Sequence, residues 1–230
     1  MSRIIAVLII ILSISGLENT AESGTKKREL SGQASEVNIT SVDARWLQKA
    51  LLYDYKSDAR PLVKEFAQAH PSEALPRDTK LDSEAYLNIM TVYLDEIPEP
   101  EHLLFIGQDQ AHTMLYVIAR RGEQWTIIFE EYVDMFNEEP ELYIINQDSR
   151  NKLFYIRMLQ ERGSGVWLLT YRFYKMVGGT VYDVLDIVQQ SNLMLEPSDL
   201  YEHVDAIVRG DSDGIFVTYK YGLPRACGCS

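Results

Sequence analysis

The feature that most constrains the fold is a series of short segments, from Leu103 onward, rich in β-branched and aromatic residues. Turn-forming pairs such as Arg121-Gly122 and Gly178-Gly179 separate these segments. Apolar residues that recur with a period of two are typical of strands, and consecutive strands joined by short turns pair antiparallel. The sequence therefore predicts an antiparallel meander. The expected strands are residues 103–107, 113–120, 124–132, 142–146, 152–160, 166–174 and 215–221.

The residues before this region follow a helical period. One helix is predicted after Ser41 and a second between Asp58 and Pro71. A third is predicted over 83–97, although its β-branched residues also suit a strand. We therefore expect an α+β fold.

In this fold a helical layer, residues 41–97, packs on one curved antiparallel sheet, residues 103–222, within a single domain over 41–226. Two later segments are less clear. Residues 181–188 fit either a strand or a helical turn, whereas 200–208 carry apolar residues at intervals of four and predict a short helix.

A weak internal repeat surrounds two tryptophans. Trp125 and Trp167 lie 42 positions apart, and each follows a short apolar run and a turn. A spacing of about 40 residues is typical of propeller blades, but two copies cannot close a ring. We predict a repeated hairpin within one curved sheet, with each tryptophan largely buried near the start of a strand.

The first fifteen residues predict export. Arg3 precedes an unbroken apolar run, Ile4 to Leu12, and small residues follow it. This run is shorter than the ~20 residues that a membrane-spanning helix needs. Residues 1–15 therefore fit a cleaved secretory signal, with an uncleaved anchor as the alternative, and 16–40 fit a flexible linker. The mature chain is expected in the periplasm or outside the cell, without a membrane span.

The charge is strongly acidic. The formal net charge is -12, and carboxylates are concentrated over 95–101 and 130–141. Negative charge repels phosphate backbones and anionic lipid surfaces, which argues against a nucleic-acid ligand. The clusters fit a solvated face, a docking surface for a basic protein partner, or a weak divalent-cation site.

A G-x-S-x-G pattern surrounds Ser212. A nucleophile elbow needs a strand before the serine, a helix after it and a histidine later in the chain. Here a predicted strand follows and no histidine comes after His203, so we predict a turn. Asp211 and Asp213 stay weak candidates for a surface calcium site.

Two further groups could carry chemistry. His102 and His112 flank a predicted turn that holds Asp109, so they could form an acid–base or metal site, or simply part of a surface turn. The tail, residues 227–230, contains both cysteines, Cys227 and Cys229. These thiols could form a strained disulfide, link two chains, bind a soft ion such as Cu(I), or be inert.

The sequence contains no complete catalytic or cofactor signature, so no cofactor is expected. The first hypothesis is an exported, acidic, non-enzymatic binding or accessory protein that acts through protein–protein contact. The alternative is a periplasmic or extracellular hydrolase with a site on the sheet. A second alternative is a metal-handling protein that uses the C-terminal thiols.

Overall fold

The computed structural model describes residues 40–134, 143–145, 153–163, 166–195, 200–211 and 214–222, apart from Glu73, 78–80, 82–84 and Gln110. The predicted signal and linker, up to residue 39, lie outside the described residues. The cysteine tail lies outside them as well.

Two short helices follow the first strand. Helix α1 covers Ala44–Leu51 and α2 covers Arg60–Ala69. Asp43 caps α1, because its carboxylate accepts hydrogen bonds from the backbone N–H groups of Arg45 and Trp46 at 2.7 and 3.1 Å. No helix in the described part of the chain is long and apolar enough to span a membrane.

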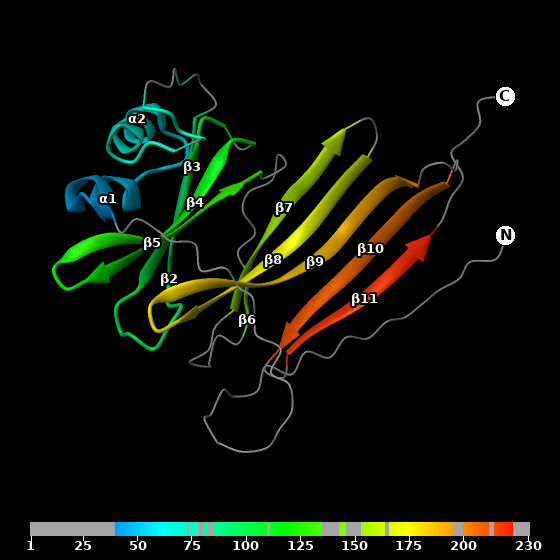
Figure 1. Cartoon of the computed structure of the whole chain (residues 1–230). Coiled ribbons are helices and arrows are strands. Elements are labelled where there is room, and N and C mark those ends of the chain that lie inside the picture. Colours follow the sequence, from blue (N-terminus) through cyan, green and yellow to red (C-terminus); the bar gives the residue numbers. More distant parts are fainter. Residues whose placement is uncertain are drawn as a thin grey trace, which may run out of the picture.

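The first sheet has five antiparallel strands in the order β1-β5-β4-β3-β2 (Figure 1). Strands β2 to β5 form a meander, and β1 pairs with the start of β5. The strands are β1 Thr40–Val42, β2 Tyr86–Val92, β3 Glu101–Gly107, β4 Thr113–Arg121 and β5 Gln124–Val133.

The second sheet has six strands in the order β11-β10-β9-β8-β7-β6, again a continuous antiparallel meander (Figure 1). Its strands are β6 Tyr143–Ile145, β7 Leu153–Gly163, β8 Val166–Val177, β9 Thr180–Leu195, β10 Leu200–Asp211 and β11 Gly214–Gly222.

The five-stranded sheet buries both of its faces. Leu104 on β3 and Tyr116 on β4 share a core cluster with Trp46 and Phe66 of the helices. The alternate residues of β3 and β4 point the other way, where they meet residues of the second sheet such as Phe154. The helices therefore lie on one side of this sheet and the six-stranded sheet on the other.

The predicted α+β fold, a helical layer over 41–97 on one curved sheet, is wrong. The described chain is mostly strand, its strands form two sheets, and only α1 and α2 are helical. Residues 86–92, inside the predicted third helix, form β2, and the predicted short helix at 200–208 is part of β10. The prediction that consecutive strands pair antiparallel is confirmed, but they form two meanders rather than one.

The two predicted tryptophan hairpins share the position of the tryptophan but not the sheet. Trp125 is the second residue of β5 and Trp167 the second residue of β8, and in the strand register they pair with Arg120 and Arg162. Both side chains are only partly buried. The two hairpins lie in different sheets rather than in one.

Candidate functional site

A cleft of about 500 Å³ opens between the two helices and the β4–β5 hairpin. We call it the helix–hairpin cleft. It is lined by β1 and the start of α1 on one side, by the last turns of α2 on another, and by the turn that begins β5. The side chains that define its chemistry are Asp43, Trp46, Glu65, Phe66, His70, Glu123 and Trp125.

Aromatic rings form the deeper part of the helix–hairpin cleft. Trp46 is only 3% exposed, and its indole N–H donates a hydrogen bond to the carbonyl of Leu62 at 3.0 Å. The ring of Phe66 lies 4.6 Å from it, centroid to centroid. Trp125 is more accessible and rests on the buried ring of His102 at 4.9 Å. These contacts hold the aromatic wall in place.

Carboxylates surround the mouth of the cleft. The backbone N–H groups of Trp46 and Arg45 hold the pKa of Asp43 below its ordinary value, so it is ionised at neutral pH. Glu65 on α2 forms an exposed ion pair with Lys49 of α1 at 3.0 Å. Glu123 lies exposed in the hairpin turn.

His70 adds no positive charge to this site at neutral pH. Burial lowers the pKa of its imidazole, and the ring packs on Phe66 at 4.7 Å. Neither lysine nor arginine is among the lining residues. The cleft is therefore negative, with an apolar floor.

The structure brings together only two of the three predicted site residues. In the β3–β4 register His102 pairs with Ile118, and Thr113 with Gly107. His102 is thus five residues along the strand from the turn, roughly 17 Å at ~3.4 Å per residue. It is 4% exposed and hydrogen-bonded to the hydroxyl of Thr91 at 3.1 Å, in a structural role.

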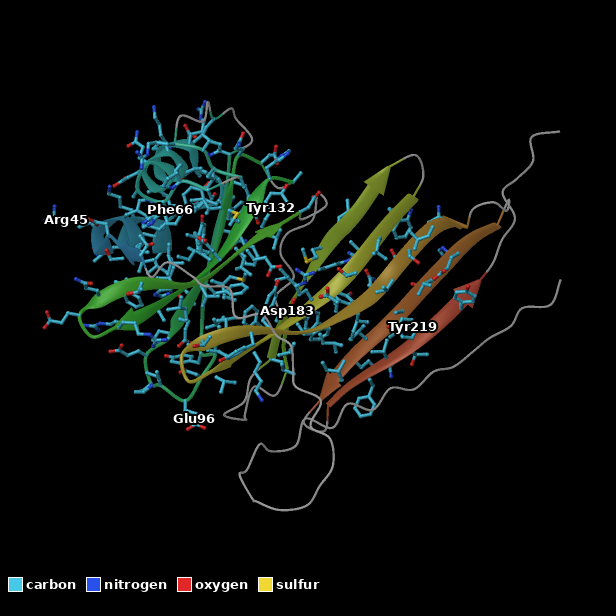
Figure 2. The ribbon with its side chains drawn as sticks, in the orientation of Figure 1. Arg45, Phe66, Glu96, Tyr132, Asp183 and Tyr219 are labelled. Carbon is cyan, nitrogen blue, oxygen red and sulfur yellow. The ribbon has the colours of Figure 1, made fainter. Side chains whose placement is uncertain are left out.

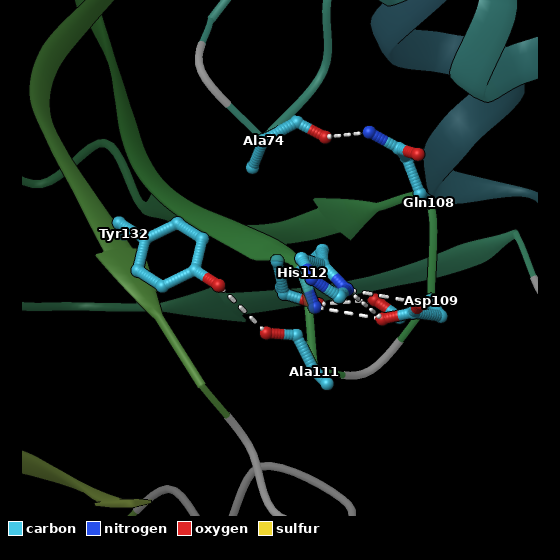
Figure 3. A network of polar contacts seen from close by, with 7 residues as sticks. Ala74, Gln108, Asp109, Ala111, His112 and Tyr132 are labelled. Atoms are coloured by element: carbon cyan, nitrogen blue, oxygen red, sulfur yellow. Dashed lines mark hydrogen bonds and ion pairs between the residues drawn. The ribbon is translucent and has the colours of Figure 1, made fainter. Parts of the chain in front are cut away.

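Asp109 and His112 meet at the β3–β4 turn (Figure 3). The carboxylate of Asp109 lies 3.0 Å from the imidazole Nδ1 and also accepts the backbone N–H of His112 at 2.7 Å. Thr113 closes the same turn by donating its hydroxyl to the carbonyl of Asp109. The imidazole is 60% exposed. This pair therefore fits the alternative of a surface turn.

The other sequence candidates do not form a described site. Asp211 ends β10 and pairs with Gly214 at the start of β11, whereas Ser212 and Asp213 lie outside the described residues. Cys227 and Cys229 also lie outside them. Within the described residues, no group of three or more His, Cys, Asp or Glu side chains is placed to bind a metal ion.

The sequence interpretation missed the helix–hairpin cleft. Its lining comes from residues 41–46, 65–70 and 123–125, which are separated along the chain and share no motif. The available signal was Trp125, a large aromatic next to a polar turn.

Together these elements define an antiparallel β protein of two packed meanders, with an acidic, aromatic cleft beside its two helices. Comparisons with protein-family models, curated proteins and solved structures found no match to this chain.

Proposed function

We propose that the chain is an exported binding protein that acts through protein–protein contact and receives a basic segment of its partner in the helix–hairpin cleft. The observation that carries this proposal is the lining of the cleft. Three carboxylates and an accessible indole surround a volume of about 500 Å³ without a lysine or arginine. Such a site concentrates cations, and the net charge of the chain, -12, has the same sign.

The chemistry of the cleft favours a basic side chain over a metal ion. An ammonium or guanidinium group can lie on the face of Trp125, because tryptophan is the strongest cation–π partner among the aromatic residues. Glu123, exposed at the mouth, is available as a counter-ion. The methylene stem of a lysine or arginine would then cover the apolar floor formed by Trp46 and Phe66.

The two alternatives from the sequence stay predictions. A hydrolase site built from His102, Asp109 and His112 would need all three side chains together, and the β3–β4 register separates His102 from the other two. The metal-handling hypothesis depends on Cys227 and Cys229, which lie outside the described residues. Neither gains support comparable to the cleft.

Binding of short labelled peptides, followed by fluorescence anisotropy, tests the proposal. A lysine- and arginine-containing peptide should bind, and a peptide of equal length with serine at the basic positions should not. The Trp125→Ala/Glu123→Gln variant should weaken binding at least about tenfold. The control Glu130→Gln removes the same charge from an exposed site on β5 outside the cleft, and should change affinity less than about twofold.

Equal losses of peptide affinity in the Trp125→Ala/Glu123→Gln and Glu130→Gln variants would contradict a local site, because only the total charge of the protein would then matter. The native partner can be sought by pull-down of the tagged protein from its envelope, with the double variant as a matched bait. N-terminal sequencing of native protein tests export: we expect a start between Gly16 and Glu22, whereas an intact Met1 in a cytosolic fraction would contradict it.

A further inference from the structure

An exposed apolar tip lies at the end of α1 and in the loop that follows. It consists of Leu51, Leu52 and Tyr55, which are 40%, 79% and 78% exposed. Single exposed apolar residues are ordinary. Three large ones within five positions form a patch, and such patches indicate contact with a partner or a membrane. The fold does not need this tip, because α1 anchors itself through Trp46, Leu47 and Ala50.

The outer face of α1 connects this tip to basic side chains. Arg45, Lys49 and Leu52 follow one another at helical spacing on the side opposite the buried residues. Figure 2 shows Arg45 directed away from the sheets. Just beyond the helix, the ammonium of Lys56 lies 5.5 Å from the ring of Tyr55. Apolar and basic groups are therefore interleaved.

The charge of the helical region is opposite to that of the chain. Residues 44–69 contain five basic and three acidic side chains, a net +2, whereas the whole chain carries -12. Two of the three acidic side chains form exposed ion pairs, Asp58 with Arg60 and Glu65 with Lys49. Exposed Arg45, Lys56 and Lys64 give the outer face of the helices a local positive charge.

We propose that this face docks on an anionic lipid surface, with Leu51, Leu52 and Tyr55 inserted among the headgroups. Leucine supplies apolar area, and tyrosine suits the boundary between headgroups and acyl chains. Lys56 and Arg45 would reach lipid phosphates while their stems stay in the interface. The acidic remainder of the chain orients this contact, because an anionic surface attracts the positive helical face and repels the excess of carboxylates. The contact is peripheral and reversible, and it does not depend on the cleft.

Vesicle sedimentation of the full-length mature chain tests this proposal. The protein should pellet with vesicles of phosphatidylcholine containing about one third phosphatidylglycerol, less with phosphatidylcholine alone, and less in high salt. Leu52→Asp should lower the bound fraction about tenfold. Ile207→Asp is the matched control, since Ile207 is 58% exposed on β10 of the other sheet and should have no effect.

Circular dichroism shows whether each variant is folded, and the exposure of both sites makes folding the expected result. Absence of pelleting by the wild-type protein would overturn the proposal. It would also fail if Ile207→Asp lost binding equally. Concentration-dependent dimerisation in light scattering, lost only in the tip variant, would instead assign the tip to a second copy of the chain and would also overturn it.

Discussion

Among single residues, Arg172 on β8 connects the neighbouring strand β9 of its own sheet to β5 of the other sheet. Its guanidinium donates two hydrogen bonds to Asp186, each 2.8 Å, and another to the carboxylate of Glu131 on β5. The hydroxyl of Tyr174 donates to the same carboxylate at 2.6 Å. Arg172 and Glu131 are only 21% and 18% exposed. Burial raises the pKa of Glu131 above its ordinary value, and Arg172 opposes that rise.

Arg172→Met should therefore destabilise the protein by about 3 kcal/mol near pH 7, because it leaves Glu131 buried without its cation. The variant should also lose stability as pH rises. Without Arg172 the pKa of folded Glu131 lies further above its unfolded value, so the folded state holds a proton that the unfolded chain has released. The deficit should be smaller near pH 5 than near pH 7, as measured by urea unfolding at both.

The matched control is Arg120→Met. Arg120 forms an ion pair with Glu99 at 3.4 Å, and both side chains are more than 40% exposed. Its loss should cost less than about 1 kcal/mol and show little pH dependence. Equal effects of the two substitutions would mean that the buried contacts of Arg172 add nothing to stability.

At the scale of whole elements, the strands joined by turn residues could be predicted from the sequence. Two helices that the sequence predicted, over 83–97 and 200–208, are replaced by the strands β2 and β10 in the structure. Leu200, Val204 and Val208 recur every four residues, which fits one face of a helix but also equals two strand periods. In β10 the strand period applies. In 86–92 the β-branched residues indicated the strand correctly, and the helical spacing of other residues misled. In both segments the strand is stabilised by hydrogen bonds to a neighbouring strand, β9 for β10 and β3 for β2. Such pairing joins residues apart in the sequence, so the local pattern of a segment does not show it.

The turn of the β8–β9 hairpin is linked to the other sheet by a hydrogen bond from Arg121 at the end of β4. Gly178 and Gly179 both have positive φ, +57° and +80°. The guanidinium of Arg121 donates a hydrogen bond to the carbonyl of Gly179 at 2.7 Å. A Cβ at Gly179 would lie 2.2 Å from that guanidinium, whereas one at Gly178 would meet open space.

We expect Gly178→Ala to cost about 1 kcal/mol from backbone strain alone, and Gly179→Ala about 2 kcal/mol because Arg121 is also displaced. Denaturant unfolding measures both. In an Arg121→Gln background the difference between the two alanine variants should shrink. If it does not, the bridge from Arg121 contributes nothing to hairpin stability.

Across the whole molecule, the division into two sheets and the helix–hairpin cleft could not be read from the sequence. The alternation of side chains along a strand determines which residues share a face. It does not determine whether that face packs on the helices or on the second sheet. One signal was present: the continuous apolar run 103–106 is typical of a strand covered on both sides, and β3 is buried along its whole length. The cleft needed three distant segments to meet, and no spacing encodes that.

The shared core predicts that the two sheets unfold as one unit. Phe105 and Val117 of the five-stranded sheet and Phe154 and Tyr174 of the six-stranded sheet belong to one buried cluster. Phe154→Ala should destabilise both sheets by about 3–5 kcal/mol. Single-tryptophan variants supply the probes, since Trp46 lies on the helical side and Trp167 on β8. Both should report the same midpoint in denaturant, and Phe154→Ala should lower both equally.

Phe216→Ala is the matched control for that experiment. Phe216 is only partly buried on β11, and it lies outside the cluster between the sheets. Because its side chain gives up less buried area, its truncation should cost about 1–2 kcal/mol. A shift of the Trp167 midpoint without a shift at Trp46 in the Phe154→Ala protein would show that the sheets unfold separately. The residues at their interface would then link two independent units, and neither sheet would depend on the other for its stability.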